Sequence, residues 1–111
     1  MREHRYRITL EHLATPRQGE PTHAAISFET GNHDDLLTIV DKVRSKNQFD
    51  ADAAASLALG LKLFTEVMLK NRSHPLFADI NQPMRDFIQK LKALPQADAQ
   101  TPPALAPEVQ D

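Results

Sequence analysis

The sequence predicts an α+β fold in which an antiparallel β-hairpin precedes three helical segments, in the order ββααα. Two stretches near the N-terminus alternate apolar and polar residues, which is typical of half-buried strands. Farther along, apolar residues recur at helical spacing, and residues 53–69 are apolar around most of a helix. Since the apolar arc of a surface helix spans roughly 100° or somewhat more, we expect this central helix to be largely buried.

The hairpin is predicted from residues 4–13 and 22–29, which alternate with period two on either side of a connection that contains two prolines and a glycine. The favoured register places Tyr6 opposite Phe28. A shift of two residues would keep the same side chains on the same faces, so the alternation alone specifies the faces better than the register.

In that register Arg5 lies opposite Glu29, so charge pairing agrees with apolar pairing. The remaining predicted pairs are Ile8 with Ile26, Leu10 with Ala24, and Glu11 with His23.

The first helix is predicted from about His33 to Lys46, after a break in the strand at residues 30–32. Asn32 is a suitable N-cap. Asp34 and Asp35 carry the negative charge that a helix N-terminus favours.

The central helix is expected to be capped by Asp50 and to end at residues 71–73. Gly60 lies within it, where glycine costs roughly 1 kcal/mol relative to alanine. This cost predicts a close crossing of another helix or strand at Gly60.

The third helical segment is predicted as a short turn at Pro75–Ile80 and a helix from about Gln82 to Leu94, capped by Asn81. The helical period continues through Pro83 without a change of phase. Because proline cannot donate a backbone hydrogen bond, the helix either kinks or begins anew there.

The length of 111 residues supports a single domain, which we place at residues 1–94. Residues 95–111 are rich in Pro, Ala and Gln, and we expect a disordered tail. The chain has no cysteine, which excludes disulfides and thiol chemistry, and its net charge is −2. With neither a secretory signal nor a spanning segment expected, the predicted location is cytoplasmic.

Three sequence stretches resemble a small family of uncharacterised bacterial proteins: HRYRITLEHL, ISFET followed by NHDDLLTIV, and GLKLFTEVMLKNR followed by HPLF. The resemblance covers about residues 4–94. It implies a compact α+β domain of bacterial origin. That family is a domain of unknown function, so the resemblance assigns no catalytic or binding residue.

The sequence predicts no catalytic residues, no metal site and no cofactor. His12 and His23 are expected near each other on opposite faces of the hairpin, whereas metal ligands must converge. Residues 50–52 resemble the start of a calcium loop, but its glycine and closing glutamate are missing.

Three functional hypotheses follow. The first is a non-enzymatic interaction or regulatory module that acts as a homodimer, because a two-stranded sheet is marginal alone and the central helix has excess apolar surface. Alternatively, a different protein could bind that surface. No membrane partner is expected. The second is a small-ligand binder with a cleft between hairpin and helices, near the aromatic residues Tyr6, Phe28 and Phe64.

The third hypothesis is a weak nucleic-acid binder that uses a sheet face carrying Arg5 and Arg7. Single-stranded RNA needs aromatic side chains on which its bases stack. Because Tyr6 and Phe28 are expected on the opposite face, the sequence disfavours a nucleic-acid partner.

Overall fold

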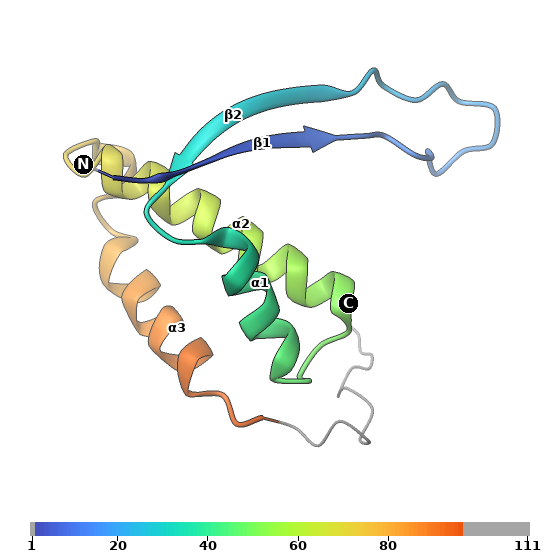
Figure 1. Cartoon of the computed structure of the whole chain (residues 1–111). Coiled ribbons are helices and arrows are strands. Elements are labelled where there is room, and N and C mark those ends of the chain that lie inside the picture. Colours follow the sequence, from blue (N-terminus) through green and yellow to red (C-terminus); the bar gives the residue numbers. More distant parts are fainter. Residues whose placement is uncertain (1, 97–111) are drawn as a thin grey trace. The chain divides into compact units, whose positions relative to one another are not determined.

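The computed structural model describes residues 2–96. Strands β1 and β2 form an antiparallel hairpin, and helices follow, as Figure 1 shows. The elements are β1 (His4–Leu10), β2 (Ile26–Asn32), α1 (Leu36–Ser45), α2 (Ala51–Lys70), the 3-10 helix η1 (Pro75–Phe77) and α3 (Asn81–Ala93). This order confirms the predicted α+β fold class.

The chain divides into two compact units, a hairpin unit that ends at His33 and a helical unit that begins at Asp34. The boundary at residue 94 that the sequence predicts for a single domain stays a prediction. Most of the predicted tail, residues 97–111, lies outside the described residues.

The predicted hairpin register is wrong by two residues. Ile8 pairs with Phe28, and Tyr6 pairs with Thr30 instead of Phe28. The reason is that β2 does not break at residues 30–32 but continues to Asn32, which pairs with His4. The shift keeps every side chain on its predicted face, because it moves the register by two residues and not by one.

Helix α1 begins at Leu36, three residues later than predicted, and its N-cap is Asp35. The Asp35 carboxylate accepts a hydrogen bond from the backbone N–H of Thr38 at 3.2 Å. The prediction that Asn32 caps this helix is therefore wrong, since Asn32 is the last residue of β2. The helix ends before Asn47, whose positive φ of 56° is one that asparagine tolerates after a helix.

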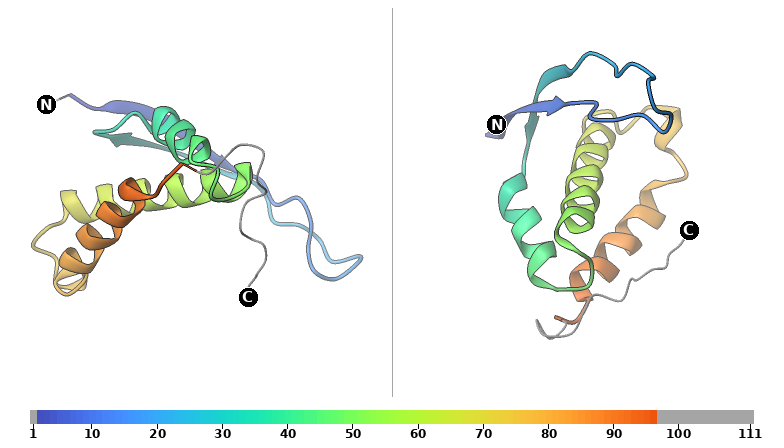
Figure 2. Two further views of the ribbon diagram at one scale, coloured as in Figure 1. Left: turned by 90° about the horizontal axis from the view of Figure 1, so that it is seen from below. Right: turned by 90° about the vertical axis from the view of Figure 1, so that its right-hand side faces the viewer.

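Helix α2 has the predicted cap, because the Asp50 side chain accepts a hydrogen bond from the backbone N–H of Ala53 at 2.7 Å. Figure 2 (right) shows α2 between α1 and α3. The small side chains of Ala54 and Ala58 form the buried centre with Val43 of α1, and Ile39 and Val40 pack against them.

The expected burial of most of α2 is realised only in part. Within residues 2–96, its buried residues are Ala54, Ala58 and Glu66. The physical reason is that α1 covers one side of α2 along a line of small residues, while much of the remaining circumference is half-buried or exposed.

Helix α3 begins at Asn81, and its N-cap is Ile80, which makes no side-chain capping hydrogen bond. The predicted cap by Asn81 is therefore wrong by one residue. Pro83 is the third residue of the helix, where a backbone N–H has no partner within the helix. Proline is tolerated in this first turn, so α3 begins two residues before Pro83 as a helix separate from η1.

The register is testable because the natural chain has no cysteine. The Thr9 and Ser27 hydroxyl oxygens lie 3.2 Å apart on paired residues. We expect Thr9→Cys/Ser27→Cys to form a disulfide readily on mild oxidation, since paired strand positions have the Cα separation that disulfides need. The readout is the free-thiol count.

The control is Thr9→Cys/Ala25→Cys, which is the pair that the predicted register would bring together. Faster oxidation of this control than of Thr9→Cys/Ser27→Cys would contradict the observed register.

Candidate binding surface of the helical unit

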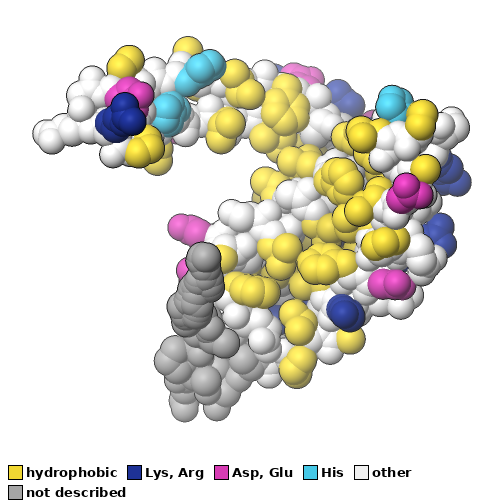
Figure 3. Space-filling model, turned by 180° about the vertical axis from the view of Figure 1, so that it is seen from behind, with side chains coloured by type: hydrophobic (Ala, Val, Ile, Leu, Met, Phe, Trp, Pro, Cys, Tyr) yellow, Lys and Arg dark blue, Asp and Glu magenta, His cyan; other side chains and the backbone are white. Residues whose placement is uncertain are grey.

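The outer side of α2 carries large apolar side chains that remain exposed. Ala54 and Ala58 are 0% and 1% exposed, whereas Phe64 and Val67 are 39% and 52% exposed. Figure 3 shows a face on which hydrophobic side chains gather over the helical unit. In an ordinary surface helix the large apolar side chains are buried in the core and the exposed positions are polar. In α2 the buried apolar residues are small, whereas these large apolar side chains are exposed.

Gly60 lies one turn before Phe64 on the same side of α2. A Cβ atom at Gly60 would meet no heavy atom within 4 Å. The predicted close crossing at this glycine is therefore not found within the described chain. Gly60, Phe64 and Val67 together form what we call the outer stripe of α2.

A pocket of about 280 Å³ lies where the last turns of α2 face η1 and α3. Met68 and Phe77 form part of its apolar wall with Met84 and Ile88 of α3. Methionine side chains are flexible and polarisable, so a wall of this kind adapts to ligands of different shape. The remaining lining residues are Thr65, Leu69, Arg72, Asn81 and Arg85.

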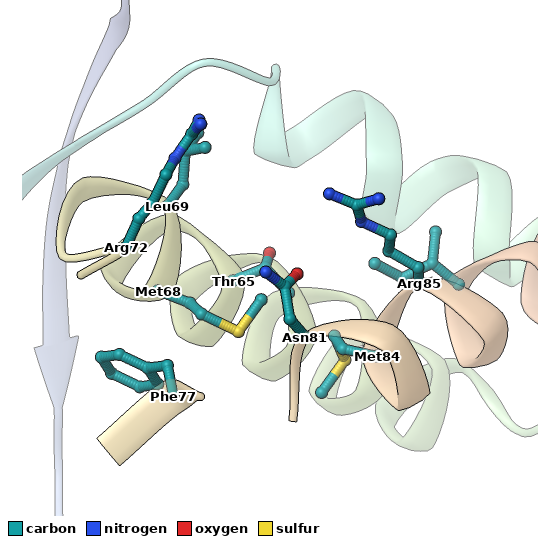
Figure 4. Close-up of a pocket in the computed structure, with 9 residues that line it drawn as sticks. Thr65, Met68, Leu69, Arg72, Phe77, Asn81, Met84 and Arg85 are labelled. Atoms are coloured by element: carbon teal, nitrogen blue, oxygen red, sulfur yellow. The ribbon is translucent and has the colours of Figure 1, made fainter. Parts of the chain in front are cut away.

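Arg72 and Arg85 enter this pocket from different elements, the segment after α2 and helix α3. Figure 4 shows both guanidinium groups on one side of the pocket, opposite the side chains of Met68, Phe77 and Met84. Within residues 2–96 neither guanidinium has an ion pair or a side-chain hydrogen bond. The pocket thus has a cationic side and an apolar side.

A second pocket, of about 360 Å³, lies among α1, α2 and α3. Its walls are apolar, and four lysines line it. Ile88 lines both pockets, so they adjoin each other at α3, and we call the two pockets together the α3 groove. The lysines are Lys42, Lys46, Lys62 and Lys92.

Lys46 has a structural role in this groove. Its ammonium donates hydrogen bonds to the backbone carbonyls of Lys92 at 3.0 Å and Leu94 at 2.8 Å. The Gln48 amide donates a further bond to the carbonyl of Pro95 at 2.7 Å. A cation at the C-terminal end of α3 also offsets the negative pole of that helix. The segment after α1 therefore holds the end of α3.

The described residues that line the α3 groove include six Lys and Arg side chains and no Asp, Glu, His or Cys. Lys62 is ion-paired with Asp34 at 3.0 Å, and Lys46 is bound to carbonyls. This lining favours the binding of anions with an apolar part. It provides no carboxylate, imidazole or thiol for acid–base or nucleophilic chemistry.

The predicted ligand-binding residues belong to two units. Tyr6 and Phe28 lie on one face of the hairpin, at diagonal positions. Phe64 belongs to the helical unit, where its ring packs edge-on against Phe77 with centroids 6.1 Å apart. The cleft predicted between hairpin and helices stays a prediction.

The predicted nucleic-acid residues are paired with acids on their own sheet face. Arg7 lies 2.8 Å from Glu29, and Arg5 lies 3.9 Å from Glu29 and 3.5 Å from Glu3. The two pairs with Glu29 are exposed on both sides, so each adds little to stability. The acids, however, offset the positive charge with which Arg5 and Arg7 would attract the phosphates of a nucleic acid. This weakens the case for nucleic-acid binding.

The two loop histidines contact each other through the backbone. The His23 N–H donates a hydrogen bond to Nδ1 of His12 at 2.7 Å, and Nδ1 of His23 lies against the carbonyl of Ala24. One ring nitrogen of each histidine is therefore already used within the loop.

None of the helices formed by residues 2–96 is both long enough and apolar enough to cross a membrane.

Comparison with known proteins gives a family match and a structural match. The profile of a family described as a domain of unknown function with a solved structure (DUF3861) matches residues 4–93. A solved structure of a protein of unknown function from Pectobacterium atrosepticum is 36% identical, with a TM-score of 0.69 over 82% of this chain and 98% of that chain. No curated protein matches the chain.

The contacts of Lys46 predict the effect of removing its charge. Lys46→Met should destabilise the helical unit by about 1–2 kcal/mol, because charged hydrogen bonds to the α3 carbonyls are lost. Hydrogen exchange of the α3 amides should become faster, whereas exchange in the first turns of α2 should change little.

The control is Lys90→Met, a substitution on α3 at a residue outside the groove lining. Equal effects of the two substitutions on α3 exchange would contradict the anchoring role of Lys46.

Proposed function

This chain belongs to the DUF3861 family of domains of unknown function, and we propose that it is a non-enzymatic interaction module that self-associates as a homodimer. The observation that carries the proposal is the outer stripe of α2, where Phe64 and Val67 remain 39% and 52% exposed while the buried positions of the helix are alanines and Glu66.

The energetics favour covering this stripe. Burying the exposed part of Val67 or Phe64 is worth about 1 kcal/mol each, since full burial of such side chains gives about 1.5–3 kcal/mol. In a two-fold symmetric dimer every residue of the patch is used twice, so each gain doubles. A second copy of the chain is therefore an efficient cover for a small patch.

Gly60 supports helix-to-helix contact in particular. Glycine destabilises a helix relative to alanine. Packing within the described chain does not require a glycine here, because a Cβ atom would meet no heavy atom within 4 Å. A glycine at this place lets a second helix approach the α2 backbone closely, with Phe64 and Val67 packing beyond the crossing point.

The nucleic-acid hypothesis has less support, because Glu29 and Glu3 accompany Arg5 and Arg7 on the sheet face. The small-ligand hypothesis is favoured by a separate observation, the cationic and apolar lining of the α3 groove.

A charge on the outer stripe tests the proposal. Val67→Lys should raise the dimer dissociation constant roughly tenfold or more, because two lysines would be desolvated in each interface. Light scattering of the full chain over a concentration series measures the mass. The fold should survive, since Val67 is half exposed.

The matched control is Leu37→Lys, which places lysine at an exposed apolar residue on α1. A monomeric wild-type chain at high micromolar concentration contradicts self-association. A dimer that tolerates Val67→Lys contradicts this choice of surface.

Gly60→Ala gives an independent test, because it acts oppositely on the fold and on the dimer. In the isolated chain it should raise the free energy of unfolding by about 0.5–1 kcal/mol, as alanine favours the helix and meets no atom. In the dimer it should weaken association, because the added methyl group separates the crossing helices.

Urea denaturation at low protein concentration measures the first effect, and light scattering measures the second. Unchanged or tighter association of Gly60→Ala would contradict a helix crossing at this residue.

A further inference from the structure

We propose that the α3 groove binds a single-chain amphipathic anion, a fatty carboxylate, with the carboxylate held by Arg72 and Arg85. The proposal concerns the groove and does not depend on self-association through the outer stripe of α2.

The head-group end is defined by the two arginines. Figure 4 shows both guanidinium groups on the same side of the pocket, and within residues 2–96 neither has an acid partner. Guanidinium is a planar fork whose geometry matches the two oxygens of a carboxylate. Figure 4 shows the two groups apart from each other, and the Asn81 amide between Met68 and Met84. The pocket thus offers two cationic donors on one side, either of which can take a carboxylate oxygen.

The chain end is defined by the apolar wall. Met68 and Met84 lie opposite the arginines, and the half-buried Ile88 leads into the second pocket. There Leu61 and Leu91 continue the apolar lining. An alkyl chain that starts at the arginines can follow this wall along α3.

The size and shape of the groove agree with a small ligand. Small-molecule sites range from about 300 to 1,000 Å³. The second pocket, of about 360 Å³, lies at the lower end of this range, and the first, of about 280 Å³, lies just below it. An inorganic anion would leave the apolar wall without a contact. A nucleotide base would need an open aromatic face, but Phe77 is buried and its ring packs against Phe64.

The charge around the groove also favours an anion. Lys42 and Lys92 line the second pocket, and within residues 2–96 their ammonium groups have no ion pair. No acid lines either pocket among the described residues. This cationic lining belongs to a chain whose overall charge is −2, so the excess of bases is local to the groove.

The experiment is calorimetric titration of the full chain with three probes: decanoate, decanol and acetate. Decanoate should bind, and both decanol and acetate should bind at least about tenfold more weakly. Decanol lacks the carboxylate, and acetate lacks the alkyl chain. A decanoate dissociation constant weaker than about 1 mM overturns the proposal. Equal binding of decanol, or of acetate, also overturns it.

Two variants locate the site. Arg85→Gln should weaken decanoate binding roughly tenfold or more, because it removes a charged hydrogen bond to the carboxylate. Its control is Lys90→Gln, which removes one positive charge from the same helix at a residue outside the groove lining. Far-UV circular dichroism verifies that both variants are folded. Equal affinity of Arg85→Gln and the wild type, or equal losses in both variants, overturns the site.

The same titration of Val67→Lys separates this proposal from self-association. Decanoate binding that persists in Val67→Lys supports a groove distinct from the outer stripe. Its loss in that variant would place the ligand on the stripe and overturn the proposal.

Discussion

The helical unit depends on the close packing of α1 against the alanine side of α2. Ala54 and Ala58 are almost completely buried, and Val43 packs against them from α1. Small side chains let two helices approach closely, but they bury little apolar area per residue. The packing therefore fixes the two helices while leaving larger side chains of α2, such as Phe64 and Val67, exposed.

The position of α3 follows from a different kind of contact. Its C-terminal end is held by polar groups, with Lys46 and Gln48 bound to backbone carbonyls of residues 92–95. Along its length, α3 borders the two pockets of the α3 groove, whose described lining includes lysines and arginines but no acid.

The sequence predicted those features that depend on neighbours along the chain. Strand alternation gave the correct faces, and Asp50 was identified as a cap because an acid before an apolar helix is a strong local signal. The register was wrong because a shift of two residues preserves the faces, so only the continuation of β2 to Asn32 decides it. The sequence also favours Asn32 as a helix cap, because an asparagine side chain is well suited to that position.

The candidate site was harder to predict. No sequence pattern links the charged residues Arg72 and Arg85 to the apolar residues Met68 and Phe77. They line one pocket only because the chain turns at η1 and brings α3 against the last turns of α2. The helical spacing of Met84, Ile88 and Leu91 predicted an apolar face but not what that face would leave open. The excess apolar surface of α2 was visible in the sequence, whereas the division into small buried and large exposed residues needed the position of α1.

We propose above all that the outer stripe of α2 faces a second copy of the chain. The most direct measurement is an isotope-filtered NOE experiment on a mixture of labelled and unlabelled full-length protein, observed at the Val67 methyl groups. The account predicts intermolecular NOEs from Val67 to aromatic protons of Phe64 in the other copy. Intermolecular NOEs confined to other surfaces, or their absence at concentrations where the protein is dimeric, would contradict it.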